Sequence, residues 1–469
     1  MTAQDVADSR TDRLRSAGLA PLDVDAWIQA EPGDLVDFRR DVSCYSAFWQ
    51  ASGDLLARLP AKRQRSATEA SAAEAILSTA RQTRERFLKR HVESVYDSLT
   101  GDKSRFLSLD ELVFAAAAAV PGLVPSQTQI AAEAGFLQRD KEGLEIDQGI
   151  LLAHVLASES AGRHLCHAML LPRPEAEELS AKFTAAGRLD VGAALIERHG
   201  KAVHLEMRNP RFLNAEDDTT LSLTETCVDL AILDPQTEIA VLRGGTVDHP
   251  NHRGRRVLGS GINLTHLYRG KIPFLWFLRR DMGYIHKILR GVARPDELPD
   301  DVNGRGVEKP WVVALETFAI GGHCQLLLAM DYIIAADDAF MTLPARKEGI
   351  IPGLANLRLP RFVGDRTARQ AIQYERRLAC DSAEGRLICD EIVPASEMDA
   401  AIERVVAGLT SAGAVSAIGN RRTLRIGQEP LDQFRRYCSI YAREQAYCHF
   451  SPALIDNLER NWNAKNRVE

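Results

Sequence analysis

The sequence predicts an α/β fold with a largely parallel sheet, preceded by an all-helical N-terminal domain. Residues 1–190 are rich in Ala, Glu, Arg, Leu and Gln, and their apolar residues recur near helical spacing. Short apolar segments with strand character follow, and helical segments separate them. Strands that alternate with helices favour a parallel sheet with helices packed on it.

The N-terminal part has clear helix signals. Ala73–Val95 places apolar residues on one helical face, and Ser108 with Glu111 forms a capping box at the start of another helix. Ile150–Leu171 is predicted to be a single helix, which the prolines that follow it bring to an end. These patterns explain packing and suggest no chemistry.

Strand and helix signals alternate in the middle of the chain. The predicted strands are Ala202–Met207, Glu238–Gly245, Trp311–Glu316 and Tyr332–Ala336, and the predicted helices are Thr220–Leu233, Leu275–Leu289 and Gly322–Ala329. We therefore expect a helical N-terminal domain over residues 1–195 and a catalytic core over residues 196–400. Residues 401–469 form a helical C-terminal segment that we expect to contact a neighbouring subunit.

Composition and charge exclude several classes of function. The formal net charge is −6, so no global basic field attracts nucleic acid. The eight cysteines include no CxxC pair and no Cys/His cluster typical of zinc, and they suit a reducing cytoplasm. Residues 1–19 lack the apolar core of a secretion signal, and the most apolar stretches are too short to cross a bilayer. We expect a cytoplasmic protein without a nucleic-acid or membrane partner.

Two glycine-containing turns are the first candidates for a reaction site. Gly259–Asn263 follows a basic segment, and Ala319–Gln325 joins a predicted strand to a predicted helix. Glycine allows a ligand to approach the backbone, and a helix start presents unpaired N–H groups. Two such turns that face each other can direct two amides at one carbonyl oxygen and so form an oxyanion hole.

The order of several motifs resembles the crotonase (enoyl-CoA hydratase/isomerase) superfamily. The segments that carry the resemblance are Asn209–Ala215, Gly259–Asn263, Ala319–Gln325 with Ala329–Ala336, Pro344 with Gly349–Gly353, Leu359–Gly364, Asp381–Glu384 and Glu391–Pro394. They are similar to the family's R-P-x-x-L-N-A, A-A-G-A-D, A-x-G-G-G-C-E, P-E-x-x-x-G-x-x-P-G, L-P-R-x-x-G, S-A-E-E-A and V-x-x-V-V-P patterns. The match covers residues 200–400, and residues 1–190 have no counterpart in simple crotonases.

This resemblance implies a crotonase-like ββα spiral that binds an acyl-CoA thioester. Its oxyanion-hole amides would be those of Ile262 and Gly322, and homotrimers or homohexamers are implied. The family's CoA-contacting positions correspond to Arg211, Ala215 and Arg256. Charge alone adds Arg253 and Arg255 as phosphate partners, with solvated surface an equal alternative for each arginine.

Departures from the family pattern narrow the reaction. Hydratases use two glutamates, and here Gln325 and Ala345 stand at those positions, so general acid–base hydration is lost. His323 replaces a glycine, and we interpret it as structural. The long helical domain, the basic insert His249–Arg256 and the run Leu213–Asp218 resemble the family's arylacetyl-CoA dioxygenases, which use dioxygen without metal or organic cofactor. That branch supplies dihydroxyphenylglycine for glycopeptide antibiotics, and CoA enters as part of the substrate.

Such an activity needs polar groups for ring hydroxyls and an apolar lining for dioxygen. We predict Glu216, Arg280 and Gln325 as substrate-binding residues. The alternative for Arg280 is a surface charge. Leu264, Ile350 and Ile351 are neighbours of the family's active-site segments and are predicted to line the oxygen pocket. Core packing explains these three residues equally well. No metal is expected, because His249 and His252 lie in a Pro/Asn/Arg loop suited to phosphate or solvent.

Two other readings remain open. Another crotonase-fold enzyme, such as an acyl-CoA hydrolase, isomerase or decarboxylase, would share the hole but need a proton donor or activated water. Glu348 or Glu216 could serve there. A catalytically silent acyl-CoA-binding protein could also arise by loss of both glutamates, although the glycines at 261, 321 and 322 argue against it.

Overall fold

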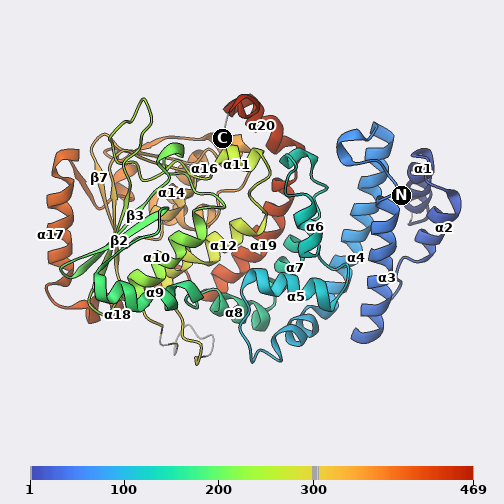
Figure 1. Cartoon of the computed structure of the whole chain (residues 1–469), viewed down its shortest axis with the longest axis horizontal. Helices are drawn as coiled ribbons and strands as arrows, with labels where there is room; N and C mark the ends of the chain where they lie inside the picture. The colour runs from blue at the N-terminus through green and yellow to red at the C-terminus, as the bar shows by residue number, and fades with distance from the viewer. Residues whose placement is uncertain (1–2, 298–303, 305, 468–469) are drawn as a thin grey trace.

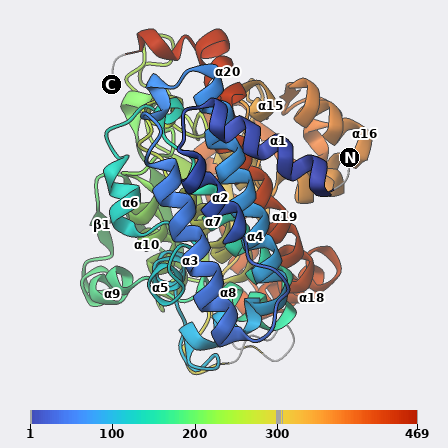
Figure 2. The same cartoon turned by 90° about the vertical axis from the view of Figure 1, so that its right-hand side faces the viewer.

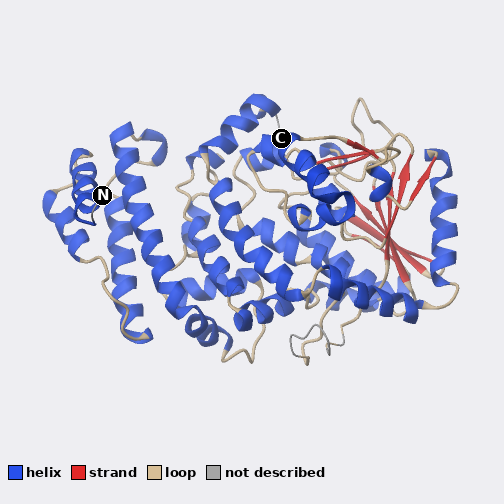
Figure 3. Ribbon diagram, turned by 180° about the vertical axis from the view of Figure 1, so that it is seen from behind, coloured by secondary structure: helices blue, strands red, loops and turns tan. Residues whose placement is uncertain are grey.

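The first helices of the chain lie at one end of the molecule and the strands at the other (Figures 1 and 3). The computed structural model describes residues 3–297, 304 and 306–467. The first two residues of the predicted helical domain and the last two of the C-terminal segment therefore lie outside the described residues, as do parts of 298–305 in the predicted core.

The N-terminal part is helical, as predicted. Its helices are α1 (Ala3–Ser16), α2 (Pro21–Gln29), α3 (Phe38–Leu56), α4 (Ala67–Thr100), α5 (Leu109–Ala119), α6 (Gln127–Ala132), α7 (Ile146–Ala157), α8 (Glu159–Ala168) and α9 (Pro174–Ala186). The capping box of Ser108 and Glu111 is confirmed. The single helix predicted over Ile150–Leu171 is wrong, because Ser158 is extended and its hydroxyl caps a new helix by accepting from the Ala161 amide.

A sheet of seven strands forms the other end of the molecule. The strands are β1 (Arg188–Asp190), β2 (Ala194–His199), β3 (Ala202–Met207), β4 (Ile239–Gly244), β5 (Trp311–Leu315), β7 (Tyr332–Ala336) and β10 (Glu391–Val393), hydrogen-bonded in that order. Strands β1 to β3 are antiparallel and the rest are parallel. The sheet begins at Arg188, inside the segment expected to be helical. This first strand was not predicted because it is short and mostly polar.

A smaller sheet and the remaining helices complete the fold. Strands β6 (Phe318–Ile320), β8 (Phe340–Thr342) and β9 (Leu378–Ala379) form the small sheet. The helices are α10 (Leu221–Leu233), α11 (Leu264–Tyr268), α12 (Leu275–Met282), α13 (Tyr284–Arg290), α14 (Gly322–Leu327), α15 (Ala345–Glu348), α16 (Ala355–Tyr374), α17 (Met398–Thr410), α18 (Ala414–Gln428), α19 (Leu431–His449) and α20 (Pro452–Trp462).

The helix predicted over Leu275–Leu289 is interrupted at Gly283. This residue has φ −87° and ψ −115°, outside the helical region. A Cβ there would lie 2.3 Å from the Arg279 carbonyl oxygen and 2.8 Å from Glu225, so only glycine fits. The break changes the direction of the chain just after Arg280 and Asp281.

The parallel strands are buried along their centre. The register pairs Leu205 with Leu242, Leu242 with Val313, and Val313 with Ile333, and all four side chains are buried. Parallel strands that are covered on both faces read as continuous apolar runs rather than as alternation. This explains why Trp311–Leu315 and Tyr332–Ala336 could be recognised as strands from composition.

A helix of the N-terminal part and a helix of the C-terminal segment pack against each other near the centre of the molecule (Figures 1 and 2). Helix α7 lies along α19, and a Cβ on Gly149 would lie 2.5 Å from the Ala446 Cβ. The Ser439 hydroxyl also donates to the Ala153 carbonyl at 2.7 Å. Glycine at 149 therefore permits the close approach that joins the helical domain to the C-terminal segment.

No single helix among the described residues is long and apolar enough to cross a membrane. Ala395–Thr410 and Ala414–Gln428 meet the length and composition test only together, across a 90° bend.

Candidate active site

The fold brings the two predicted glycine turns together. Gly259 and Ala319 form a parallel bridge, and the Ile320 amide donates to the Gly259 carbonyl at 3.1 Å. Gly261 has φ +86°, and a Cβ on it would lie 3.2 Å from the Gly322 nitrogen. A side chain at 261 would be both strained and in the way of the second turn.

Two backbone amides converge at this junction. Within the part of the chain that the structure describes, the amides of Ile262 and Gly322 donate to no protein acceptor. Gly322 is the first residue of α14, where an amide has no partner inside the helix. Both residues line the same pocket, so their amides can hold a negatively charged oxygen between them.

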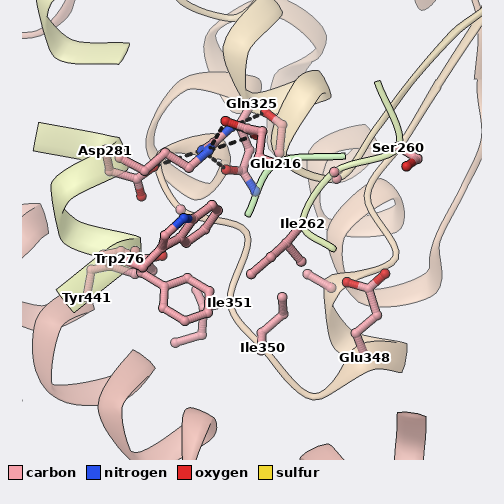
Figure 4. Close-up of a pocket in the computed structure, with 17 residues that line it drawn as sticks. Glu216, Ser260, Ile262, Trp276, Asp281, Gln325, Glu348, Ile350, Ile351 and Tyr441 are labelled. Carbon is pink, nitrogen blue, oxygen red and sulfur yellow. Dashed lines mark hydrogen bonds and ion pairs between the residues drawn. The ribbon is translucent and has the colours of Figure 1, made fainter. Parts of the chain in front are cut away.

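The pocket encloses roughly 440 Å³, its open mouth included (Figure 4). Its lining residues come from turns and helices that are distant in sequence: Glu216, Ser260, Gly261, Ile262, Trp276, Phe277, Arg280, Asp281, Gly321, Gly322, Gln325, Ala345, Glu348, Ile350, Ile351, Gly353 and Tyr441. The predicted Glu216, Arg280, Gln325, Ile350 and Ile351 are therefore brought together with both amides.

Arg280 links the polar residues of the pocket and is not a surface charge. Its Nη2 lies 2.8 Å from Glu216 Oε2, and its Nη1 donates to Gln325 Oε1 at 2.9 Å. Nη1 also donates to Asp281 Oδ1 at 3.0 Å, and Nη2 donates to the Gly322 carbonyl at 2.6 Å. The guanidinium thus fixes two carboxylates, one amide side chain and the start of α14.

Electrostatics hold this cluster in its charged form. Burial by itself would raise the pKa of Glu216, but the charge of Arg280 and hydrogen bonds from Arg280 and Tyr284 lower that pKa overall. The Glu216 carboxylate in turn raises the pKa of Arg280 further above its ordinary value, against the effect of burial. Glu216 is therefore an ionised hydrogen-bond acceptor and not a proton donor.

Gln325 has a defined orientation. A guanidinium only donates hydrogen bonds, so the side-chain oxygen of Gln325 must face Arg280. The amide nitrogen of Gln325 is left to donate toward a ligand. This combination places an acceptor, Glu216, and a donor, Gln325, in one pocket wall.

Two further polar atoms of the lining have no partner. Asp281 Oδ2 and Trp276 Nε1 are buried and make no hydrogen bond within the described residues. Burial raises the pKa of Asp281 to about 6, although Arg280 opposes this rise. In Figure 4 the Trp276 indole and Asp281 lie on the side of the pocket opposite Ser260 and Glu348. The indole N–H is a donor only and the carboxylate oxygen an acceptor, so each atom keeps an unused hydrogen-bonding capacity.

Glu348 is the other carboxyl group of the pocket. Burial, reinforced by the charge of Glu375, raises its pKa to about 7. Its carboxylate makes no hydrogen bond or ion pair with a described residue. Glu348 also lines a second, larger pocket, which it shares with Ser260 and Ile262.

This adjoining pocket is a channel that leads to the amides. It encloses about 1570 Å³ with its open mouth and contains the predicted Arg211 and Ala215. Lys347 and Arg467 also line it and were missed by sequence reasoning. A positive charge beside an apolar channel suits the phosphates and the pantetheine arm of coenzyme A, and the sequence offers no local signal that would place these two residues there.

Arg253, Arg255 and Arg256 are not brought to either pocket. Arg253 and Arg255 are exposed and pair with acidic surface residues, Asp248 and Asp338. Arg256 pairs with Glu206 at 2.5 Å and donates to the Gly244 carbonyl. The CoA contacts expected of these arginines stay predictions, and in this structure their guanidinium groups pair with acidic residues of the same chain.

The three residues predicted to line the oxygen pocket lie in two different pockets. Ile350 and Ile351 line the pocket that holds the amides, whereas Leu264 lines the adjoining channel. The apolar wall is completed by Phe277 and Tyr441, which sequence reasoning missed. Tyr441 comes from α19, and its spacing there is that of an ordinary amphipathic helix.

His323 agrees with the structural interpretation. It is fully buried, and its Nδ1 accepts from the Gly261 amide at 3.1 Å. A Cβ on Gly259 would lie 2.1 Å from the imidazole, so the ring packs directly on the Gly259 backbone. Burial lowers the pKa of His323 to about 4, so the neutral ring supports the first turn.

One cluster in the described part of the chain has metal-ligand geometry. Ligand atoms of Asp217, Asp218 and His266 lie within 4.8 Å of one another. Asp217 already accepts hydrogen bonds from Asn263 and Thr219, and His266 Nδ1 lies 2.7 Å from Asp218. These hydrogen bonds explain why the three side chains lie together: they stabilise the chain next to Glu216.

Comparison with known proteins identifies the family. The family model for enoyl-CoA hydratase/isomerase matches residues 303–418. The chain belongs to this family, the crotonases. A relative that matches along most of the chain is (3,5-dihydroxyphenyl)acetyl-CoA 1,2-dioxygenase of Amycolatopsis orientalis, which is 47% identical over 398 residues, 85% of this chain and 90% of the relative.

Other similarities are more distant. Carnitinyl-CoA dehydratase of Salmonella typhi is 23% identical over 244 residues, 52% of this chain and 84% of the relative. An enoyl-CoA hydratase structure from Mycobacterium avium subsp. paratuberculosis K-10 is 19% identical with a TM-score of 0.47, covering 57% of this chain and 98% of that one. One from Bacillus halodurans is 17% identical with a TM-score of 0.47, covering 57% and 99%.

Proposed function

We propose that the protein is a dioxygenase that converts (3,5-dihydroxyphenyl)acetyl-CoA and dioxygen to 3,5-dihydroxyphenylglyoxylate and free CoA, without metal or organic cofactor. The main support for this proposal is one pocket, which is lined both by the unpartnered amides of Ile262 and Gly322 and by the Glu216–Arg280–Gln325 cluster. The activity for which the Amycolatopsis orientalis relative is named supports this substrate.

The substrate would enter through the channel. Its CoA part lies along the walls that contain Arg211, Ala215, Lys347 and Arg467, and its thioester oxygen accepts from the two amides. One ring hydroxyl donates to Glu216 and accepts from the Gln325 side-chain nitrogen. The other hydroxyl meets the second unpartnered pair, Trp276 Nε1 and Asp281 Oδ2.

The reaction needs no redox group from the protein. Loss of one α-proton gives an enolate whose negative oxygen is held by the amides of Ile262 and Gly322. The enolate carbon passes electrons to dioxygen and forms a C–O bond, which gives a peroxide. The peroxide attacks the thioester carbonyl and the C–S bond breaks. The O–O bond then breaks as the second α-hydrogen leaves as a proton, so both oxygen atoms end in the product.

The surroundings of this chemistry are apolar where dioxygen has to approach. Ile350 and Ile351 provide that lining, and Leu264 lies one step away in the channel. We place the enzyme in the cytoplasm, in supply of dihydroxyphenylglycine for antibiotic biosynthesis, and as a homotrimer or homohexamer, on the resemblance to its family.

The test is oxygen uptake with a panel of arylacetyl-CoA thioesters. We expect one dioxygen consumed per CoA released, with (3,5-dihydroxyphenyl)acetyl-CoA the preferred substrate. Equal turnover without oxygen would favour a hydrolase, isomerase or decarboxylase. Tight binding without reaction of any thioester would favour a silent acyl-CoA-binding protein.

The second hydroxyl contact has its own test. Trp276→Phe removes the indole donor and keeps an aromatic ring of similar shape. For the 3,5-dihydroxy substrate, kcat/KM should fall by the equivalent of roughly 1–3 kcal/mol, the cost of an unpaired buried polar group. For the 3-hydroxy substrate, kcat/KM should not change. An equal loss with both substrates would show that Trp276 does not contact the second hydroxyl.

A further inference from the structure

The proposed reaction begins with loss of an α-proton, and none of the residues assigned so far accepts it. The amides of Ile262 and Gly322 only donate hydrogen bonds. Gln325 is neutral, and Ala345 stands where a hydratase has its second glutamate. A general base must reach the proton at hydrogen-bond distance or through one water.

Among the residues that line the pocket, three have carboxyl groups: Glu216, Asp281 and Glu348. Glu216 is engaged by Arg280 and Tyr284, which lower its pKa and make it a poor base. Asp281 is held by Arg280 and lines only the inner pocket, not the channel. Glu348 lines both spaces, together with Ile262 and Ser260, where the channel meets the pocket.

The position of Glu348 is fixed by its neighbours. It ends the single turn of α15, three residues after Ala345, so both side chains occupy one face of that turn. Gly349 follows with φ +90°, and its backbone packs so closely on α20 that a Cβ would lie 2.9 Å from the Leu454 Cα. Hydrogen bonds then hold the next residues, including the Ile351 amide to Gln445 Oε1 at 2.9 Å.

The charges around Glu348 suit a base that works near neutral pH. Burial and the Glu375 carboxylate raise its pKa to about 7, and Lys347 opposes the rise. Both Lys347 and Arg346 lie near Glu375 on the outer side, at 3.7 Å each. Helix α20 presents the neutral Asn457 and Asn461 to this region.

We propose that Glu348 is the catalytic base that removes the α-proton of the bound arylacetyl-CoA. The α C–H bond breaks, its electron pair moves into the enolate held by Ile262 and Gly322, and the proton is held on the Glu348 carboxyl. This inference rests on the proposed function, but its chemistry ends before dioxygen reacts.

The experiment therefore leaves oxygen out. Full-length enzyme is incubated anaerobically in D₂O with (3,5-dihydroxyphenyl)acetyl-CoA, and loss of the α-hydrogen signal is followed by NMR. Wild type should exchange at a rate that rises with pH through an apparent pKa near 7. Glu348→Gln should slow exchange by about 10²–10⁴-fold while the thioester still binds. Glu375→Gln, which removes the neighbouring charge, should move the profile to lower pH.

Asp390→Asn is the matched control, because it neutralises another carboxyl whose pKa burial raises but which lies outside both pockets, and it should leave exchange unchanged. Exchange by Glu348→Gln at the wild-type rate, with unchanged affinity, would overturn the assignment. So would a wild type that consumes oxygen but never exchanges without it. Exchange in wild type without oxygen uptake would instead overturn the proposed dioxygenase and leave the base in place.

Discussion

Arg280 and Glu216 form an ion pair inside the pocket wall, with 2.8 Å between Nη2 and Oε2 and both side chains buried. The two residues come from different elements, α12 and the loop before α10, so the pair ties the first half of the catalytic core together. A buried pair of this kind is costly to break on one side only, because the remaining charge stays in a poorly solvated place.

Arg280→Met should therefore destabilise the protein strongly. We expect the free energy of unfolding to fall by about 3–5 kcal/mol, since Glu216 loses its counter-ion. Arg280→Met combined with Glu216→Gln should cost less than Arg280→Met alone. Urea unfolding followed by fluorescence gives the values. Arg369→Met, at an exposed pair with Asp365, is the control and should change stability by less than about 1 kcal/mol.

Gly322 can be probed with two substitutions that differ in the amide. A Cβ at 322 would lie 2.7 Å from Glu216 Oε2, so both Gly322→Ala and Gly322→Pro disturb the wall. Gly322→Pro also removes the N–H, and proline is tolerated at a helix start. We expect kcat of the proline variant to be lower than that of the alanine variant by about 10²–10³. Equal rates in two folded variants would remove Gly322 from the oxyanion hole.

Gln325→Ala should reduce discrimination for the ring hydroxyl. Its side-chain nitrogen is the free donor, and an unpaired substrate hydroxyl costs about 1–3 kcal/mol. The ratio of kcat/KM for the 3,5-dihydroxy substrate over phenylacetyl-CoA should fall accordingly, measured by oxygen uptake. Gln325→Glu should also lower kcat, because it places negative charge near the enolate. An unchanged ratio in Gln325→Ala would refute the proposed orientation of the ring.

Chelation tests the expectation that no metal takes part. Among the described residues, the Asp217–Asp218–His266 cluster is the candidate metal site that this experiment tests. Side chains of the cluster already take part in hydrogen bonds within the chain. We expect oxygen uptake to survive exhaustive chelation, with elemental analysis showing no stoichiometric metal. Activity that disappears and returns with one particular metal would contradict the proposal, and Asp218→Asn would then locate the ion.

Glu348 predicts a pH dependence of stability as well as of rate. Its pKa is raised from an ordinary 4.5 to about 7, so the folded state binds a proton that the unfolded state has released. Wild type should lose stability relative to Glu348→Gln as pH rises from 4.5 to about 7, and the difference should be constant above that range. Thermal unfolding at several pH values measures it. A difference that does not vary with pH would mean that the carboxyl titrates normally.

The sequence predicts the α/β core and the two glycine turns because those signals are local. A glycine turn and an apolar strand are each written in a few consecutive residues, and β3 and β7 were predicted with their bounds. The breaks at Ser158 and Gly283 were missed because a hydroxyl cap and a crowded glycine depend on neighbours that the hydrophobic period does not reveal.

The candidate site was only partly predictable for the same reason. Glu216 and Gln325 follow recognisable motifs, and Arg280 was grouped with them although nothing local shows that it is buried. Trp276 and Lys347 are contributed by tertiary packing. The ion pairs of the basic segment at residues 253–256 could not be predicted, because the partners Asp338 and Glu206 are remote in sequence.

The packing of α7 on α19 connects the helical domain to the wall of the pocket that holds the two amides. Among the described residues, the helical domain lines neither the pocket that holds the two amides nor the adjoining channel. Tyr441 and the Gln445 that holds Ile351 nevertheless both belong to the helix on which Gly149 rests. A change in the angle between these two helices would move Tyr441 and Ile351 and so alter the width of the pocket that holds the two amides. A substitution in the helical domain that moves α7 could therefore change the size of the substrate ring that fits this pocket. The residues proposed to contact the thioester would stay the same.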